Sequence, residues 1–355
     1  MKKLVLTGGG SAGHVTGNLA LLSTLKQAGW EIEYIGSKDG IESTIIAETG
    51  LPYHSIAVGK LRRYFDLKNF KDPFRVLQGT FQAFRLLRKI KPKAVFSKGG
   101  FVAVPVVIAA WINRIPVVIH ESDLTPGLAN KLSVPFANKV CVTFPETVQH
   151  LDRQKANHTG SPIRSEILRG SAEAGRAFCG FTTDKPIILA MGGSLGSVAI
   201  NNALRQNLDA LLQQFQIVHL CGKDNLDPRL EGLSGYRQFE YVSHELPDLF
   251  AMTDLFISRA GSNAIFEFLA LKKPNLLIPL TRAQSRGDQI LNARSFEKQG
   301  YSHVLFEEDL TSASLLAAVR ETHDNRERYI AAMEQSTSGH AVEQIVSLIQ
   351  QVAKK

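Results

Sequence analysis

The sequence has few of the features that define specialised protein classes. It has three cysteines, odd in number and far apart, which argues against a disulfide framework or a zinc site and is typical of a reducing compartment. The longest apolar run, residues 101–112, is too short to span a bilayer. Residues 1–3 lead directly into an apolar run, so we expect no secretion signal. No Asp-x-Asp pair occurs that could hold a divalent metal on a diphosphate, and we expect neither a metal nor another cofactor.

Positive charge is concentrated in one segment. The chain carries a net +8, but residues 60–93 contain eleven Lys and Arg against two Asp, so the rest of the chain sums to −1. From residue 74 to 90, bulky apolar residues recur at helical spacing, which is typical of a helix on an anionic membrane. Packing of the same stripe against a sheet is the alternative. No recognition motif or aromatic platform favours nucleic acid, which we do not expect as a partner. The predicted membrane residues are Arg75, Phe81, Phe84, Arg85, Arg88 and Lys89.

Apolar runs alternate with helical patterns, which predicts an α/β protein with parallel sheets. The order strand, glycine loop, helix begins at residues 4–15 and again at 187–199, so we expect two doubly wound domains. The turn at 159–162 sets the predicted domains at 1–161 and 162–339. A last helical pattern, 340–353, could pack on either. The predicted strands are 3–7, 31–36, 94–97, 115–119, 139–143, 186–191, 216–221, 254–258 and 275–278, and the predicted helices include 17–28, 199–213 and 262–271.

The first glycine loop, GGGSAGHV at 8–15, resembles two phosphate-binding motifs without completing either. The dinucleotide motif requires an acid after the next strand, where Ser37-Lys38 stands, and a P-loop requires lysine where His14 stands. A helix N-terminus remains, which suits an anion, although the glycines could serve only tight packing. The helix dipole favours a neutral His14 that can accept a proton, unless the ring merely caps the loop.

Other polar clusters follow predicted strands, where open α/β sheets bind ligands. In the second half these are the loop 192–196, the turn 258–263 with Glu267 behind it, and the segment 284–292. In the first half they are 97–101 and 120–123. Tight turns, a solvated helix face and generic polar loops are the alternative interpretations.

Together these motifs resemble one family. The order of the motifs is that of the MurG family, and their sequences are most similar to those of its Gram-positive branch. The motifs are Gly9-Gly10-Ser11-Ala12-Gly13-His14-Val15, Lys98-Gly99-Gly100-Phe101, His120-Glu121, Gly192-Gly193-Ser194, and Arg259-x-Gly261 with Glu267. The resemblance runs almost from end to end. It implies a GT-B fold of two Rossmann-like domains facing a cleft, with helix 340–355 returning to the first domain. It also implies an inverting N-acetylglucosaminyltransferase that converts lipid I to lipid II with UDP-GlcNAc in peptidoglycan synthesis, peripheral on the cytoplasmic face of the cell membrane.

The family resemblance also implies roles for individual residues. His14 would be the base, with Asp123 as its rival. The first loop would hold the acceptor diphosphate, Ser194 the donor diphosphate and Glu267 the uridine ribose. The implied acceptor-binding set is Gly10, Ser11, Ala12, Gly13, Lys98, Gly99, Gly100, His120 and Glu121; the donor-binding set is Arg164, Gly193, Ser194, Val242, Gly261, Ser262, Glu267, Asp288 and Gln289.

Two departures from the family pattern bear on these roles. Ser122-Asp123 replaces a usual Gln-Asn, which puts one donor contact in doubt, and Ala12 replaces a usual glycine. The alternatives are a UDP-GlcNAc epimerase or lipid galactosyltransferase on the same fold, a nicotinamide-dependent oxidoreductase, and a non-catalytic membrane scaffold that uses residues 60–93.

Overall fold

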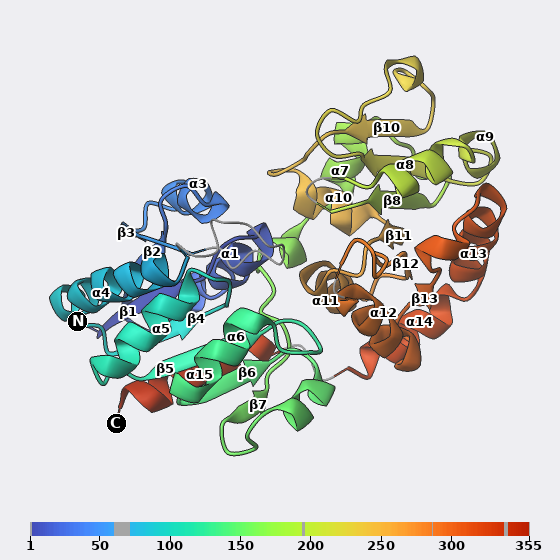
Figure 1. Ribbon diagram of the computed structural model, residues 1–355. Coiled ribbons are helices and arrows are strands. Elements are labelled where there is room, and N and C mark those ends of the chain that lie inside the picture. The colour runs from blue at the N-terminus through green and yellow to red at the C-terminus, as the bar shows by residue number, and fades with distance from the viewer. Residues whose placement is uncertain (1, 60–71, 194–195, 286, 337–339, 355) are drawn as a thin grey trace. The chain divides into compact units, whose positions relative to one another are not determined.

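The computed structural model divides the chain into two compact units (Figure 1). Unit 1 comprises residues 1–164 with 338–355, and unit 2 comprises 165–337. The structure describes residues 2–59, 72–193, 196–285, 287–336 and 340–354. Much of the basic segment, from 60 to 71, therefore lies outside the described residues.

Unit 1 contains a seven-stranded parallel sheet in the order β3-β2-β1-β4-β5-β6-β7. The strand order reverses beside β1, which pairs with β2 on one side and β4 on the other, so this switch point is where a doubly wound sheet opens a crevice. The strands are β1 (Lys2–Thr7), β2 (Trp30–Ser37), β3 (Tyr53–Ile56), β4 (Ala94–Ser97), β5 (Val117–Glu121), β6 (Lys139–Val142) and β7 (Ala156–His158).

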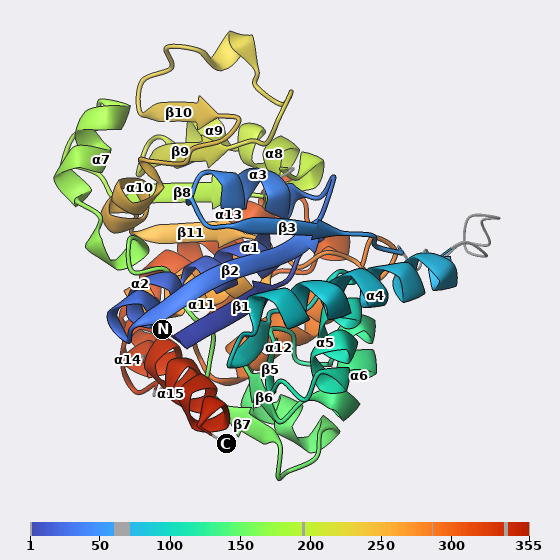
Figure 2. The same ribbon diagram turned by 90° about the vertical axis from the view of Figure 1, so that its left-hand side faces the viewer.

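Helices cover both faces of this sheet and bury an apolar core on each. On one face α4 packs beside α5, and on the other α15 packs beside α2 (Figure 2). The helices of unit 1 are α1 (Ala12–Leu19), α2 (Leu22–Gln27), α3 (Ile41–Ala47), α4 (Asp72–Ile90), α5 (Ala103–Ile112), α6 (Leu128–Ser133) and α15 (Ala341–Ala353).

The last helix joins the two ends of the chain in one unit. The apolar stripe Ile345, Ile349 and Val352 of α15 lies in the same core cluster as Leu4 and Leu6 of β1. Because that stripe repeats at the helical period, the helix buries one whole face. The C-terminal segment thus belongs to the unit that holds the first glycine loop.

Unit 2 repeats the plan with a six-stranded parallel sheet in the order β10-β9-β8-β11-β12-β13, with its switch point between β8 and β11. Its strands are β8 (Ile187–Met191), β9 (Gln216–Leu220), β10 (Tyr236–Phe239), β11 (Leu255–Ser258), β12 (Asn275–Leu277) and β13 (His303–Val304). Its helices are α7 (Ala172–Cys179), α8 (Val198–Arg205), α9 (Leu208–Leu211), α10 (Leu246–Met252), α11 (Ser262–Leu271), α12 (Asp288–Lys298), α13 (Ser312–Asp324) and α14 (Arg326–Glu334).

The structure corrects the sequence-based elements in two ways. The four strands that the sequence analysis missed, β3, β7, β10 and β13, are the edge strands of the two sheets. The predicted helix 17–28 is two helices, α1 and α2, and α1 begins at residue 12, inside the glycine-rich segment. The predicted helix 199–213 is likewise divided into α8 and α9.

The packing of α15 predicts a specific loss of stability. Ile349 is fully buried, so Ile349→Ala should lower the free energy of unfolding of unit 1 by about 2–4 kcal/mol, through lost apolar burial and the cavity left behind. Both tryptophans, Trp30 and Trp111, lie in unit 1, so their fluorescence during urea unfolding reports on this unit. The exposed neighbour Gln351, changed to Ala, is the matched control and should leave the midpoint almost unchanged. Equal midpoints for both variants would contradict the packing of α15.

Candidate functional site

The first glycine loop is fixed by contacts to its backbone. The Tyr34 hydroxyl donates to the Gly8 carbonyl at 2.7 Å, and the Gly9 N–H donates to the Gly99 carbonyl at 3.3 Å. Gly100 takes a positive φ of 84°, and a Cβ there would overlap the Gly9 carbonyl. The loops after β1 and β4 therefore interlock at the switch point of the sheet, and glycine is required where they touch.

A buried carboxylate, Glu42 of α3, holds the other side of this loop. Its Oε2 accepts the Gly10 N–H at 3.2 Å, and its Oε1 accepts the Ser37 N–H at 3.1 Å and hydroxyl at 2.5 Å. Burial by itself would raise the pKa of Glu42, but these hydrogen bonds outweigh it and hold the pKa below its ordinary value. Glu42 is therefore a carboxylate. A Cβ on Gly9 would overlap that carboxyl group, so a side chain at position 9 would displace Glu42.

The sequence analysis did not identify Glu42. It looked for an acid at the end of β2, where a dinucleotide-binding fold holds a ribose, and found none. The acid stands a few residues later in the first turn of α3, only 1% exposed, and it binds the protein's own loop. The available signal was a carboxylate at the start of a helical pattern, Ile41-Glu42, directly after Gly40.

His14 lies in the first turn of α1 with its Nδ1 at 2.8 Å from the Gly9 carbonyl and 3.1 Å from the Ser11 hydroxyl. A carbonyl only accepts, so Nδ1 carries the proton and Nε2 keeps its lone pair. Burial lowers the pKa of His14 below its ordinary value and the positive charge of Lys98 adds to this, against the opposing effects of the Gly9 hydrogen bond and of Glu42. The ring is therefore neutral and holds the loop while presenting a basic nitrogen.

Lys98 and His120 form a buried polar pair beneath the loops. Lys98 Nζ lies 2.8 Å from His120 Nδ1 and donates to the Ser122 hydroxyl at 2.7 Å. His120 Nε2 lies 3.0 Å from the Gly160 carbonyl, so Nε2 carries the ring proton and Nδ1 accepts from Lys98. Burial lowers the pKa of Lys98 to about 7, although Glu121 and Asp123 oppose the shift, and burial lowers the pKa of His120 well below its ordinary value. With 1% and 0% exposure, these two residues support the loops from inside.

Glu121 organises the loop that follows β5. Its two carboxylate oxygens accept the Asp123 N–H at 2.9 Å, the Gly127 N–H at 3.0 Å and the Asn130 side-chain amide at 2.8 Å. Glu121 is 4% exposed, while Asp123 is half-buried. The structure thus gives Glu121 a positioning contact to the backbone of Asp123, the alternative base.

In unit 2, Arg259 joins the loops after β8, β11 and β12. One of its terminal nitrogens donates to the hydroxyl of Ser197, the N-cap of α8, at 2.7 Å, and the other donates to the Ile278 carbonyl at 3.0 Å. It also forms an ion pair with Glu307. These three strands are neighbours in the sheet, so Arg259 fixes their carboxyl ends as one surface.

The predicted donor residues of unit 2 lie on this same edge. Gly193 stands after β8 with φ 91°, Gly261 and Ser262 begin α11, and Glu267 lies half-buried one turn further along it. Gln289, in the first turn of α12, accepts the Leu280 N–H at 3.1 Å through its amide oxygen. Of two further predicted donor residues, Asp288, next to Gln289, is half-buried, and Val242, after β10, is buried. Arg164 is the last residue of unit 1, and Ser194 lies outside the described residues.

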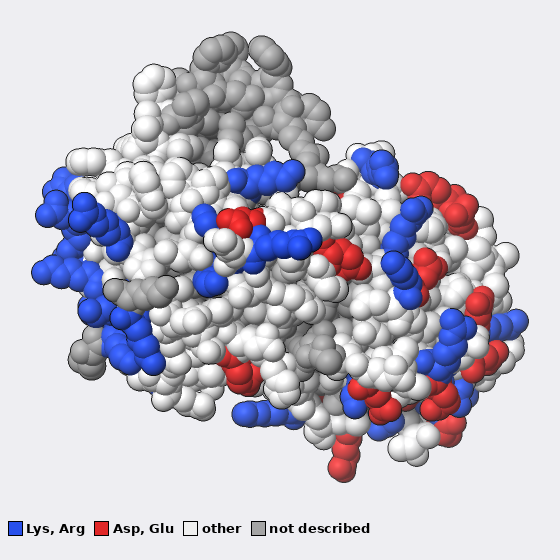
Figure 3. Space-filling view, turned by 90° about the horizontal axis from the view of Figure 1, so that it is seen from below, with Lys and Arg blue, Asp and Glu red and all other residues white. Residues whose placement is uncertain are grey.

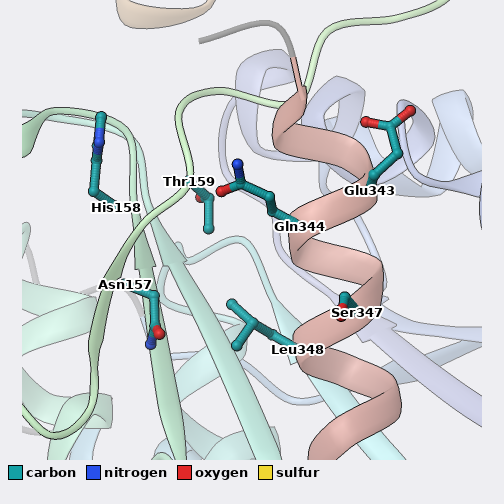
Figure 4. A pocket seen from close by; sticks show the side chains of 7 residues that line it. All are labelled: Asn157, His158, Thr159, Glu343, Gln344, Ser347 and Leu348. Carbon is teal, nitrogen blue, oxygen red and sulfur yellow. The ribbon is translucent and has the colours of Figure 1, made fainter. Parts of the chain in front are cut away.

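A cavity of about 510 Å³ lies elsewhere, between β7 and α15 of unit 1 (Figure 4). Gln344 and Leu348 of the helix face Thr159 and Asn157 of the sheet edge. β7 is four strand positions from β1, roughly 19 Å at the usual strand spacing, and the cavity contains none of the predicted site residues.

Among the residues that the structure describes, no group of three His, Cys, Asp or Glu is placed to hold a metal ion. The expectation that the reaction needs no metal remains a prediction.

Two family models match the chain. The glycosyltransferase family 28 N-terminal domain matches residues 4–142, and the glycosyltransferase family 28 C-terminal domain matches residues 187–352. A relative from Geobacillus thermodenitrificans (strain NG80-2), a UDP-N-acetylglucosamine--N-acetylmuramyl-(pentapeptide) pyrophosphoryl-undecaprenol N-acetylglucosamine transferase, is 60% identical over 99% of each chain. A relative of the same name from Clostridium tetani is 56% identical over 98% of each chain.

Solved structures agree on the fold. The crystal structure of Acinetobacter baumannii MurG superimposes with a TM-score of 0.78 at 25% identity, covering 99% of this chain and all of that one. The crystal structure of a UDP-GlcNAc 2-epimerase from Neisseria meningitidis bound to UDP-GlcNAc superimposes with a TM-score of 0.71 at 13% identity, covering 99% of this chain and all of that one. At this identity the match shows the fold alone. The expected GT-B fold class is confirmed, as is the family resemblance drawn from the motifs.

The buried Lys98 predicts a pH-dependent stability. Its folded pKa of about 7 lies below the ordinary 10.5, so above pH 7 the unfolded chain binds a proton that the folded chain has released. Stability therefore rises with pH over this window, by at most about 1.4 kcal/mol per pH unit. Urea unfolding followed by tryptophan fluorescence, from about pH 7 to about pH 8.5, should show this rise in the wild type and a flatter dependence in Lys98→Met. The same slope in both proteins would show that Lys98 keeps its ordinary pKa.

Proposed function

The chain belongs to glycosyltransferase family 28, and we propose that it transfers N-acetylglucosamine, with inversion, from UDP-GlcNAc to the muramyl 4-hydroxyl of lipid I, giving lipid II and UDP. The observation that carries this proposal is the similarity, over almost the whole chain, to the N-acetylglucosamine transferases from Geobacillus thermodenitrificans and Clostridium tetani. The neutral His14 at the switch point of unit 1 supplies a group that can take up the proton released by an attacking hydroxyl.

The chemistry is a displacement at the anomeric carbon of GlcNAc. The 4-hydroxyl oxygen of the acceptor forms the new bond to that carbon, the bond to the UDP oxygen breaks, and the electron pair leaves with UDP. His14 Nε2 takes the hydroxyl proton as general base, because Nδ1 already carries a hydrogen directed at Gly9. Asp123 stays the second candidate for this role.

The acceptor diphosphate is proposed to meet the N-terminus of α1. The N–H groups of Gly9 and Gly10 are bonded to Gly99 and Glu42, so the diphosphate would lie against the next part of the loop, where α1 begins. The first turn of a helix lacks intrahelical partners and carries partial positive charge, so it suits a phosphate. Lys98, Gly99, Gly100, His120 and Glu121 then shape this site from beneath.

The donor is proposed to bind at the carboxyl edge of the unit 2 sheet. The N-terminus of α8 and the loop containing Gly193 and Ser194 would stabilise the negative charge on the departing UDP, with no metal in that role. Glu267 would accept hydrogen bonds from the uridine ribose. Gln289 would contact the GlcNAc hydroxyls through its NH2, which has no hydrogen-bond partner among the described residues.

Membrane attachment is proposed to involve the outer face of α4. Ala83, Leu87 and Ile90 of this helix are buried in the unit 1 core, so the packing interpretation holds for one face. On the opposite face Phe74, Leu77 and Phe81 are 75%, 67% and 60% exposed. Arg85 and Arg88 lie over the rings of Phe81 and Phe84, at 5.8 and 5.7 Å from the centroids, and with Arg75 and Lys89 they are exposed.

An exposed apolar row bordered by cations suits an anionic membrane surface. Figure 3 shows Lys and Arg side chains gathered on the side of unit 1 at the left of that view. None of the described helices is long and apolar enough to span a membrane. The proposed site of action is the cytoplasmic face of the cell membrane.

The reaction predicts acceptor-dependent release of UDP. Purified enzyme with UDP-GlcNAc should release UDP only when a lipid I analogue is present, should form a disaccharide product, and should keep its rate in EDTA. Release without acceptor would favour an epimerase or hydrolase over the transferase. Complete loss of transfer in EDTA would contradict the metal-free reaction.

The membrane contact predicts that charge reversal on α4 releases the protein from vesicles. The triple variant with Arg85, Arg88 and Lys89 changed to Glu should no longer sediment with anionic phosphatidylglycerol vesicles. It loses both the electrostatic attraction to the anionic lipid and the cations that border the apolar row. The control variant carries the same change in net charge on unit 2, where the exposed residues Lys223, Lys298 and Arg320 are all changed to Glu. Equal vesicle binding of the two variants would place the contact elsewhere.

A further inference from the structure

A hydrogen-bonded chain connects Glu42 to His14 through a single peptide group. The Gly10 N–H donates to Glu42 Oε2 at 3.2 Å, and the Gly9 carbonyl, on the other side of the same peptide bond, accepts from His14 Nδ1 at 2.8 Å. The carboxylate, the peptide and the imidazole are thus arranged in series. Hydrogen bonds in such a chain polarise one another.

We propose that Glu42 is a positioning residue for the base: through the Gly9–Gly10 peptide it orients the His14 ring and stabilises the imidazolium that forms when Nε2 takes the acceptor's proton. The proposal rests on the proposed function, in which His14 is that base. Glu42 touches neither substrate in this assignment. It acts as the acid of a catalytic triad does, with a peptide bond placed between the acid and the ring.

The geometry around Glu42 fits this task. Its carboxylate is 1% exposed, and Ser37 fixes Oε1 with two hydrogen bonds, which leaves Oε2 directed at Gly10. A carboxylate held so firmly in a buried site interacts strongly with charge that develops nearby, because little solvent screens it. Removal of the charge should therefore affect His14 more than a change on the surface would.

The charged groups near His14 come from two sides. Lys98, from the loop after β4, disfavours the imidazolium, and Glu42, from α3, favours it. Tyr34 and Tyr53 face Glu42, and burial raises the pKa of each hydroxyl, so both are neutral when His14 titrates. Glu121 and Asp123 act on Lys98.

Glu42→Gln keeps the size of the side chain and removes the charge. We expect kcat to fall between about 10-fold and 100-fold, since a weaker base is left in the site, with a smaller change in the KM for the lipid I analogue. The acid limb of the kcat/KM profile should move to lower pH, because His14 loses the charge that favours its protonated form. Glu48→Gln, an exposed change close by on the chain at the end of α3, should alter neither quantity.

A double-mutant cycle with His14→Ala separates coupling from general damage to the loop. If Glu42 acts through His14, Glu42→Gln has almost no further effect in the His14→Ala background. An equal effect in both backgrounds, or an acid limb that does not move, would overturn the proposal. Glu42→Asp keeps the charge and should restore the position of the acid limb if the glutamine variant folds poorly.

The ring can also be titrated directly. In NMR of protein labelled at histidine, with the His14 signal assigned by its absence from His14→Ala, the pKa of His14 should be lower in Glu42→Gln than in the wild type and unchanged in Glu48→Gln. An unchanged pKa in Glu42→Gln would overturn the proposal without reference to activity. Failure of the proposed function looks different: the wild type would show no acceptor-dependent UDP release, or His14→Ala would keep near-full kcat.

Discussion

The backbone of Gly9 is the contact on which the candidate site of unit 1 depends. Its N–H binds the loop after β4, its carbonyl receives His14, and the carboxyl group of Glu42 occupies the space that a side chain would need. Three elements that are distant in the sequence therefore meet at a residue that has no side chain. Any larger residue at position 9 would meet the carboxyl group of Glu42 and displace it from the Gly10 N–H.

Around this point unit 1 buries a carboxylate, Glu42, a lysine, Lys98, and a second carboxylate, Glu121. Burial of a charge costs free energy unless hydrogen bonds replace the lost water, and each of these three groups has at least two such bonds. Apolar side chains in place of buried charges are often neutral or stabilising, so stability does not explain these three groups. The arrangement instead fixes the loop backbones at the switch point, where positions must be accurate for binding and chemistry.

The interior strands and the fold class could be predicted from the sequence because a strand buried on both faces consists of a continuous apolar run. The edge strands could not, because segments such as Tyr53–Ile56 and Ala156–His158 have one open side and carry polar residues. The same limit applies to the site. Glycine loops and His14 stand out as local patterns, whereas Glu42 and Arg259 act through hydrogen bonds to loops far away in the chain, and only the fold brings those partners together.

The two units use one topology but hold their first glycine loops with opposite charges. In unit 1 an anion, Glu42, binds the loop that carries His14, and its charge favours protonation of that ring. In unit 2 a cation, Arg259, binds the N-cap of α8, and Glu307 balances its charge. The N-terminus of α8 also carries the partial positive charge of the helix dipole. The same topology thus supports the loop after its first strand with a carboxylate in unit 1 and with an arginine–glutamate pair in unit 2. This difference matches the roles proposed for the two loops, proton uptake by His14 in unit 1 and stabilisation of the departing UDP in unit 2.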